Sequence, residues 1–516
     1  MSLWNNIKNL FRRGGDKLAQ MTDKELQTIL DHPKISLSKD EVDRIREDFT
    51  IYAGKHPQVE YLNSMREKKK RDFQGLNMTK VASEYMANIV FNEQCEINIS
   101  DKHAEAKEFI NKVLEDNKFI KNLSTYLEPM FATGGLAVRP YVDNGRIEFS
   151  WCLADTFYPL KSNTNDITES VIASRSINVE NDKEIFYTLL EFHEWQGSDY
   201  VITNELYRSE RKEVVGRRVS VSMLYANLPE RVVFNAAVAP LNQPLFSYLK
   251  PVGFNNISPR SPLGLSLVDN AKSTIKRIDE VSDQFFWEIK KGKRRIIASE
   301  HFVNTSIDPV SGRPIQYFDA DEDMFLALPS AIDDMQWKDI TPEIRSQQYI
   351  ASLNSFLATL EMQIKVSPGT FYFDGAGVKT ATEVISEDSL TFRTRSANVN
   401  AVSEFIKDVL ISVFELASRT IGPDGKLLYT GEIPAKSDIG IDFDDGIFTD
   451  KKSQLDYYAQ AQSAGLIPKT IVIQRLFDVD DTTAKEWLEL MVAENNSSNP
   501  LLKQISAEQS LLGGDE

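Results

Sequence analysis

The stretch that comes closest to a nucleotide-binding loop is Gly375-Ala376-Gly377-Val378-Lys379-Thr380. A phosphate-binding loop places glycine directly before lysine, so that backbone amides and the ammonium group converge on one phosphate. Here Val378 stands between Gly377 and Lys379, and no apolar strand of the required kind precedes the segment. The pattern therefore predicts a glycine-rich turn before a helix.

The side chains that bind metals are scattered. No two histidines stand at ligand spacing on one helix; they are His32, His56, His103, His193 and His301. His193 lies in an alternating stretch and is expected to be a half-exposed strand residue. Asp442, Asp444 and Asp445 lack the spacing of a calcium loop and predict a solvated turn. We expect no catalytic residue, no metal site and no cofactor.

Two runs of basic side chains are the remaining candidates for a binding surface. The first run contains Arg66, Lys68, Lys69, Lys70 and Arg71, and the second contains Lys290, Lys291, Lys293, Arg294 and Arg295. A solvated charged face is the simpler interpretation of the first. The second stands where a long predicted helix enters an insertion, so a docking surface or a DNA contact is an equal alternative there.

The charge balance argues against tight DNA binding. The 516 residues carry 59 Lys and Arg against 76 Asp and Glu, a formal net charge of −17, whereas tight DNA binding requires cations that neutralise phosphates. An acidic wall would still suit a conduit past which a polyanion slides, because it offers no phosphate contacts. Charge alone therefore fits both a protein that ignores DNA and one that guides it loosely.

Cysteine content and hydropathy limit the cellular compartments in which the protein is expected. Only Cys95 and Cys152 are present, which gives no disulfide framework and fits a reducing compartment. Met1–Arg13 lacks the continuous apolar core of a signal peptide, and no run of about 18 apolar residues occurs, so we expect neither export nor a membrane partner. A chain of this length should form about two to four folding units.

Residue periodicity predicts an α+β chain. Helices are expected over 78–90, 104–114 and 123–130, a β-hairpin about Asp143-Asn144-Gly145, and strands over Val201–Tyr207 and Val214–Val221. Two later helices of similar length should form an antiparallel hairpin. The first opens at Ser261-Pro262 and ends near Gly292, and the second has Thr341 as N-cap and Pro342 at its first position.

The segments around and after this hairpin are also patterned. Lys293–Asp339, with a turn cluster at Pro309–Pro314, predicts a small β-containing insertion at the hairpin tip. A turn-rich aromatic loop, Val366–Lys379, precedes a helix expected to run from Thr380 to Ile421 with a kink in its polar middle. A strand over Ile439–Phe443, short helices ending at Gly465 and covering Ile471–Phe477 and Thr482–Glu494, and a frayed tail over Asn495–Glu516 should complete the chain.

Four stretches resemble the portal, or head-to-tail connector, proteins of tailed phages, especially siphophages that infect Gram-positive bacteria. They are Leu76-Asn77-Met78-Thr79-Lys80-Val81-Ala82, Gly134-Gly135-Leu136-Ala137-Val138-Arg139-Pro140-Tyr141, Ser261-Pro262-Leu263-Gly264, and Gly377-Val378-Lys379-Thr380-Ala381-Thr382-Glu383-Val384. None carries a catalytic group. The order of the segments along nearly the whole chain carries the resemblance.

The resemblance implies a division of the chain into named parts. They are a wing over 1–260 and 380–449, stem helices over 261–292 and 341–365, a clip over 293–340, a tunnel loop over 366–379, and a crown over 450–516. About twelve copies would form a ring with the stem helices around a negatively lined channel. The implied function is packaging, retention and ejection of DNA at the capsid vertex of the virion, after assembly in the bacterial host cytoplasm.

The resemblance also implies site residues and partners. The tunnel-loop residues expected to face DNA are Val366, Ser367, Phe371, Tyr372, Phe373, Asp374 and Lys379, with the three aromatics at or near the tip. The expected docking residues of the clip are Lys293, Arg294 and Arg295. Implied partners are further copies of the chain, double-stranded DNA, the terminase large subunit, the major capsid protein and scaffold, and a head-completion adaptor.

Two other functions stay open on the sequence alone. A packaging enzyme, either an ATPase or a nuclease, would need a true phosphate loop or a carboxylate metal cluster, and ATP hydrolysis by the isolated chain would reveal it. A virion structural or scaffold protein without a channel would form no rings.

Overall fold

A computed structural model describes most of the chain. The described residues are 25–62, 67–91, 95–163, 166–237, 240–292, 341–372, 389–423, 425–443, 451–477 and 481–498, with five short strands between 296 and 339. The chain divides into two units, residues 1–443 and residues 444–516. Among the described helices, none combines the length and apolar content that a bilayer span requires.

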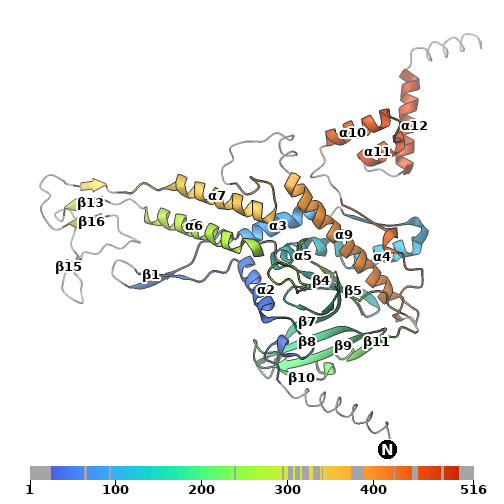
Figure 1. Ribbon diagram of the computed structural model, residues 1–516, viewed down its shortest axis with the longest axis horizontal. Helices are drawn as coiled ribbons and strands as arrows, with labels where there is room; N and C mark the ends of the chain where they lie inside the picture. Colours follow the sequence, from blue (N-terminus) through green and yellow to red (C-terminus); the bar gives the residue numbers. More distant parts are fainter. Residues whose placement is uncertain are drawn as a thin grey trace, which may run out of the picture. The chain divides into compact units, whose positions relative to one another are not determined.

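Four helices form the first layer of the larger unit (Figure 1). They are α2 (Lys39–Tyr52), α3 (Met78–Val90), α4 (Ala104–Asp116) and α5 (Phe119–Thr133), close to the bounds that periodicity predicts for the last three. Ser38 caps α2 by accepting the Glu41 N–H at 3.3 Å. Helix α5 ends at Gly134, whose φ of 87° is the left-handed conformation that glycine adopts freely.

A β-hairpin follows α5 and confirms the prediction made from its turn. Strands β4 (Leu136–Asp143) and β5 (Arg146–Leu153) are antiparallel, and β12 (Ser247–Leu249) pairs with β4 to complete a three-stranded sheet. Asn144 and Gly145 have φ values of 48° and 76°, as a two-residue hairpin turn of type I′ requires.

The second sheet has six antiparallel strands. Its path runs β10 (Arg217–Val219), β9 (Asp199–Ser209), β8 (Lys183–Gln196), β7 (Ile167–Glu180) and β6 (Phe157–Ser162), and β11 (Arg231–Phe234) also pairs with β9. The strand expected over Val214–Val221 is therefore shorter, because Val215 is buried against Leu26 and Gly216 pairs with Leu26 outside the sheet. Each fully buried aliphatic or aromatic side chain stabilises this core by about 1.5–3 kcal/mol.

The two predicted helices of the hairpin are present but begin later than expected. The first consists of a 3₁₀ turn, η4 (Asp269–Ala271), and α6 (Lys272–Lys291), and not of a helix from Ser261. Residues 261–268 form no helix, since a Cβ on Gly264 would lie 2.4 Å from the Gly134 carbonyl oxygen and Leu263 is buried in the core.

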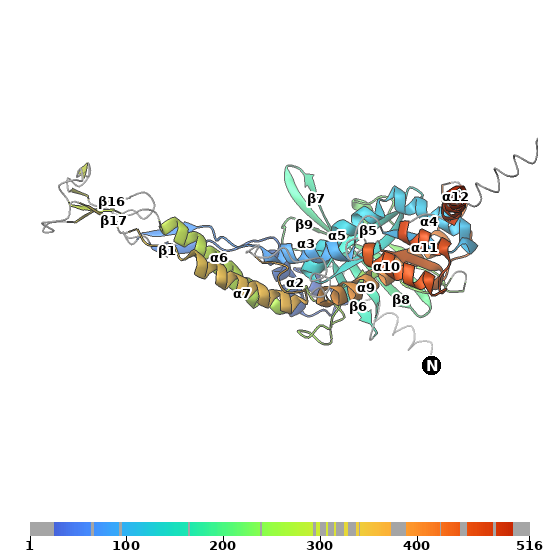
Figure 2. The same ribbon diagram turned by 90° about the horizontal axis from the view of Figure 1, so that it is seen from above.

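The second helix of the hairpin is α7 (Ser346–Ile364), so Thr341 is not its N-cap and Pro342 does not open it. The Glu288 carboxylate accepts the backbone N–H of Arg345 at 3.2 Å and so fixes the residue before the first turn. Figures 1 and 2 both show α6 and α7 side by side. A short hairpin, β1 (Val59–Leu62) and β2 (Lys68–Arg71), lies beside α6.

The insertion between α6 and α7 contains β-structure, as predicted. Strand β13 (Ile296–Ser299) pairs in parallel with β16 (Phe325–Leu328) and antiparallel with β17 (Trp337–Asp339). Strands β14 (Ser306–Ile307) and β15 (Pro314–Ile315) pair on either side of the predicted turn cluster.

A long helix, α9 (Ser389–Ala417), packs on β4 and β12. It ends four residues before the predicted Ile421, and residues 380–388 of the prediction lie outside the described residues. It is a continuous helix from Ser389 through Asn398, where the sequence predicts a kink. The predicted strand is β18 (Ile439–Asp442), paired with β3 (Glu96–Ile99).

The smaller unit is helical, as the sequence predicts. Its helices are α10 (Lys451–Ser463), α11 (Lys469–Phe477) and α12 (Asp481–Ser498). Helix α11 packs against both neighbours, with Phe477 and Trp487 in an edge contact at 5.6 Å. The expected frayed tail is wrong for residues 495–498, which belong to α12.

Candidate functional site

The α6–α7 pair is closed where α6 ends and α7 begins. The rings of Phe285 and Tyr349 stack with centroids 5.1 Å apart. Arg345 donates two hydrogen bonds to the Glu288 carboxylate at 2.9 and 2.5 Å, and the Tyr349 hydroxyl donates a third at 2.9 Å. The Arg345 guanidinium lowers the pKa of Glu288 to about 2. These contacts confirm the predicted antiparallel hairpin.

A segment from an earlier part of the chain, residues 71–76, is hydrogen-bonded along α6. Asp283 accepts two hydrogen bonds from the Arg71 guanidinium at 2.5 and 2.6 Å and one from the Gln74 N–H at 3.0 Å. One turn earlier, Asp279 accepts the Leu76 N–H at 2.8 Å. Arg71 lowers the pKa of Asp283, which therefore stays ionised. The β1–β2 hairpin is thus tied to the helix by two carboxylates.

The base of α6 is held by a buried ionic joint. We define the joint as Arg44 and Asp48 of α2, Asp269 of η4 and Lys272 of α6. Arg44 bonds to Asp269 at 2.6 Å and to Asp48 at 3.4 Å, and Lys272 contacts the same two carboxylates at 2.9 and 2.7 Å. Burial, and then the neighbouring Asp269, raise the pKa of Asp48 to about 8. The joint fixes the helix pair to the first helical layer.

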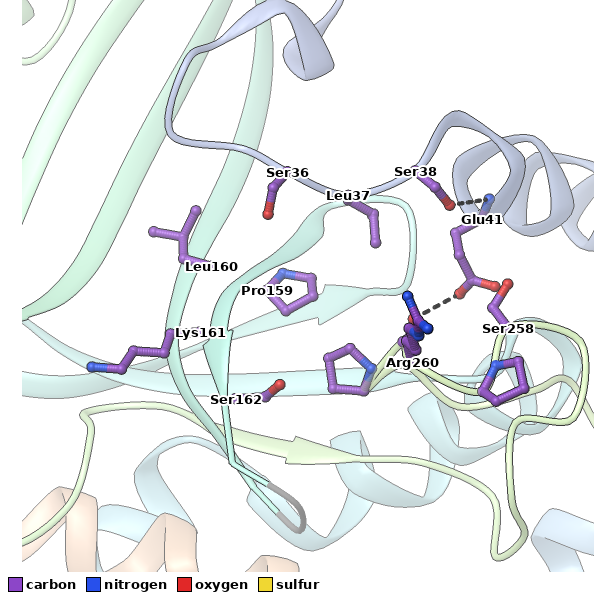
Figure 3. Close-up of a pocket in the computed structure, with 13 residues that line it drawn as sticks. Ser36, Leu37, Ser38, Glu41, Pro159, Leu160, Lys161, Ser162, Ser258 and Arg260 are labelled. Carbon is purple, nitrogen blue, oxygen red and sulfur yellow. Dashed lines mark hydrogen bonds between the residues drawn. The ribbon is translucent and has the colours of Figure 1, made fainter.

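A cavity of about 530 Å³ adjoins this joint (Figure 3). Its walls come from the start of α2, strand β6 and the loop before η4. Glu41, on its floor, already accepts hydrogen bonds from Arg44 at 3.1 Å and Ser261 at 3.0 Å, and Lys161 pairs with Glu169 at 3.2 Å. Glu41 and Lys161 are therefore already paired within the fold, and the lining contains no histidine or cysteine.

The chain after α7 folds back onto the pair. Lys365 ends the helix with a φ of 61°, and the Thr394 hydroxyl donates to its carbonyl at 2.8 Å. The buried Glu361 carboxylate then accepts the backbone N–H groups of Gly369 at 2.9 Å and Phe371 at 2.6 Å. One side chain of α7 therefore latches the first half of the loop.

The most catalytic-looking cluster is structural. His193 bonds through Nδ1 to Tyr200 at 2.8 Å and through Nε2 to Glu191 at 2.6 Å, and Arg139 contacts Glu191 at 2.8 Å. His193 lies in strand β8, which confirms the predicted strand position. It is only 1% exposed, so the prediction of a half-exposed residue is wrong. Tyr200 is buried as well, which leaves no access for a substrate.

The other chemistry-bearing side chains add no reactive site in the described residues. Burial raises the pKa of Cys95 to about 12, which keeps this thiol protonated. Within the same residues, no group of three His, Cys, Asp or Glu side chains could hold a metal ion. Asp444 and Asp445, and the glycine-rich segment 375–380, lie outside the described residues.

Comparison with known proteins assigns the family. The model of the family "Phage portal protein, SPP1 Gp6-like" matches residues 31–499, which is most of the chain. The chain belongs to this portal family. No curated protein matches it significantly. As a phage portal protein it acts in DNA packaging at the capsid vertex of the virion, and the family is structural and forms oligomeric rings with capsid and packaging partners.

The predicted tunnel-loop residues of this portal protein fall into three groups. Val366 and Ser367 are 0% and 3% exposed, so the prediction that they face DNA is wrong. The Ser367 N–H instead donates a hydrogen bond to the Thr391 hydroxyl of α9, which fixes the start of the loop against this helix. Phe371 is half-buried against Tyr85, with ring centroids 5.6 Å apart, and Tyr372 is 56% exposed. Phe373, Asp374 and Lys379 lie outside the described residues.

The charge of the helix pair differs from expectation. The exposed charged side chains of α6 are Lys276, Arg277, Glu280, Lys290 and Lys291. Helix α7 has no charged residue from Ser346 to Leu360, and its one carboxylate, Glu361, is buried. The expected acidic lining is therefore not carried by these two helices, because the surplus of carboxylates lies elsewhere in the chain. Lys293, Arg294 and Arg295 of the predicted clip lie outside the described residues.

Sequence reasoning missed the residues that position these elements. Asp279 and Asp283 stand at the four-residue spacing of one helix face within an otherwise apolar stripe, which is a signal for a polar partner. Glu361 is the single charged residue within α7, another such signal. Nothing in the sequence relates Arg44 to Asp269, since their contact depends on the tertiary fold.

Proposed function

We propose that about twelve copies of this portal protein form a ring in which the α6–α7 pairs surround the DNA channel. In this arrangement 293–340 is the clip, 366–379 the tunnel loop, 450–516 the crown, and 1–260 with 380–449 the wing. The family match over residues 31–499, which brings with it a ring around DNA, carries the proposal. The antiparallel rods bonded by Glu288 and Arg345 supply the wall.

The surface of α7 supports its role in a wall that DNA passes. Its exposed face is uncharged and consists mostly of small or polar side chains, with Ile350 and Met362 as the large apolar exceptions. The small or polar ones include Gln348, Ala351, Ser352, Ser355 and Ala358. Such a face holds no phosphate and allows a neighbouring helix to approach closely. A ring also needs two different contact surfaces on each copy, and the exposed Phe286 and Ile289 of α6 provide an apolar one.

The latch on Glu361 supports a gating role for the loop. A loop that grips or gates DNA needs a fixed root and a free tip. The root is fixed, because Glu361 holds Gly369 and Phe371 while Ser367 is bonded to Thr391. Beyond this root, Tyr372 is the first exposed aromatic side chain.

The partners follow from the same arrangement. Lys293, Arg294 and Arg295 at the entrance to the clip dock the terminase large subunit during packaging and the head-completion adaptor afterwards. The major capsid protein and scaffold contact the ring during assembly in the bacterial host cytoplasm. The chain catalyses no step itself, and purified rings should therefore release no phosphate from ATP above a buffer blank.

Deletion of residues 373–378 tests the gating role. We expect ring formation to match that of the wild type, while genome content per particle falls at least severalfold, because the tip no longer reaches the DNA. Charge reversal of Lys183, an exposed residue at the start of β8 in the proposed wing, is the control and should package normally. Normal genome content in the deletion variant would refute the gate.

A further inference from the structure

The fold brings together the two basic runs that the sequence leaves more than 200 residues apart. Trp287, near the end of α6, lies between them. The Arg71 guanidinium lies 4.6 Å from the centre of its ring, and the Lys290 and Lys291 ammonium groups lie 5.5 and 5.0 Å from it. Tyr61 of β1 meets the same ring edge-on at 5.2 Å.

The hairpin strand β2 adds a further cation beside this ring. Tyr61 is the cross-strand partner of Lys69, so Lys69 is on the same face of the hairpin as Tyr61 and Arg71, whereas Lys68 is on the other face. We call the set Lys69, Arg71, Trp287, Lys290 and Lys291 the Trp287 surface. Arg71 is paired with Asp283. Among the described residues, Lys69 and Lys290 form no ion pair with a carboxylate.

A groove of about 500 Å³ opens beside the Trp287 surface, between the ends of α6 and α7. Trp287 and Lys291 belong to both. Its other wall carries Pro342 and Ile344, and the Glu288–Arg345 pair closes its floor. The combined surface therefore presents unneutralised cations next to an apolar slot framed by an aromatic ring.

We propose that the Trp287 surface docks an acidic protein segment that carries an apolar side chain, supplied by a packaging partner. Carboxylates of the segment meet Lys69 and Lys290, and its apolar side chain enters the groove against Trp287 and Ile344. In a chain with a net charge of −17, such a local cationic surface attracts an acidic partner and speeds its encounter.

Two observations favour a protein segment over duplex DNA. A fixed cluster of cations holds phosphates, which opposes the passage of DNA that a portal must allow. A phosphate backbone also has nothing to place in an apolar groove, whereas a leucine or aromatic side chain gains free energy there. The proposal depends on the proposed docking role of the clip in one respect only, namely that a packaging partner supplies the segment.

The test uses purified full-length chain and fluorescence anisotropy of labelled probes. The probes are a 14-residue peptide of about twelve glutamates and two leucines, the same peptide with glutamine in place of glutamate, and a 20-base-pair DNA duplex. We expect the acidic peptide to bind, its affinity to fall with added salt, and the glutamine peptide to show no binding.

The variants locate the binding. Lys69→Glu with Lys290→Glu should weaken peptide binding about tenfold or more, since two attractive contacts become repulsive. The neutral pair Lys69→Gln with Lys290→Gln should weaken it less. Trp287→Ala should weaken it by removing one wall of the groove. Lys276→Glu with Arg277→Glu, about three turns earlier on α6, is the matched control and should change it less than twofold.

Three results would overturn the proposal, and each differs from failure of the channel function. Equal loss in the matched control would make the binding non-specific. Tighter binding of the duplex, lost in the same variants, would assign the surface to DNA. Loss of rings in the Lys69→Gln with Lys290→Gln variant would assign it to a neighbouring copy. Normal rings and packaging are compatible with any outcome of the peptide measurement.

Discussion

The base of the α6–α7 pair is fixed by buried ions, whereas its far end is closed by an exposed ion pair and two stacked rings. Three of the four side chains of the joint are almost fully enclosed: Arg44 is 6% exposed and Asp48 and Asp269 are 0% exposed, while Lys272 is 20% exposed. At the far end Arg345 is 66% exposed. Each end of the pair has an arginine bonded to carboxylates, so the two ends differ mainly in how deeply these charged groups are buried.

The difference indicates which end can move. A buried charge cannot leave its partners without a large desolvation penalty, so the base stays in one arrangement. An exposed pair is screened by solvent and exchanges readily with water. The rods should therefore be anchored at the first helical layer and adaptable toward the clip, where packaging proteins exchange.

Arg44→Met should have the largest effect, because it leaves the buried Glu41 without its cationic partner and leaves Asp48 and Asp269 with Lys272 alone. We expect a loss of about 3–5 kcal/mol in the free energy of unfolding, measured by urea denaturation of the full chain. Arg345→Met is the matched change at the far end and should move the midpoint only slightly. Equal losses at both ends would contradict the contrast.

Glu361→Gln should have the next largest effect, since an amide cannot accept both backbone N–H groups with the same strength. We expect a loss of about 1–3 kcal/mol and faster amide hydrogen exchange at Gly369 and Phe371. Glu404→Gln, an exposed carboxylate on α9, is the control and should leave both sites protected. Unchanged exchange in Glu361→Gln would show that the latch does not hold the loop.

The base of the α6–α7 pair should lose stability as the pH rises. The pKa of Asp48 is raised to about 8, so the folded state holds a proton that the unfolded chain has released, and stability falls as pH rises from about 4 toward 8. We expect Asp48→Asn to flatten this slope by at most about 1.4 kcal/mol per pH unit, the limit for one proton. A slope that the variant leaves intact would mean that another group carries the proton.

The far end of the α6–α7 pair should lose stability as the pH falls, and this loss should be smaller than the loss at the base. Arg345 lowers the pKa of Glu288 to about 2, so its stabilisation is present above about pH 4 and is lost as pH falls toward 2. Nuclear magnetic resonance titration of the Glu288 carboxyl should show this midpoint in the wild type and a value near 4 in Arg345→Met. A midpoint near 4 in both would show that the pair does not persist in solution.

Elements with strong local signals were predictable from the sequence. The turn Asn144-Gly145 sets its hairpin by backbone conformation alone, and the stripes of α6 and α7 match a buried helix face. Both helix starts were predicted too early, because Ser261-Pro262 and Thr341-Pro342 carry genuine start signals that tertiary contacts override. At Ser261 the override is the close approach of Gly264 to Gly134.

The site was less predictable, since it depends on contacts between distant segments. The β1–β2 hairpin is built from a basic run that looks like a solvated face, and only its placement beside Trp287 gives it an apolar neighbour. Val366 and Ser367 follow directly after an amphipathic helix, and no local feature shows that α9 covers them.

Native mass spectrometry of the purified full-length chain tests the central claim most directly. We expect one closed assembly of about twelve copies, with a central hole visible in negative-stain averages of the same sample. A single-copy species at every concentration and salt condition would contradict it.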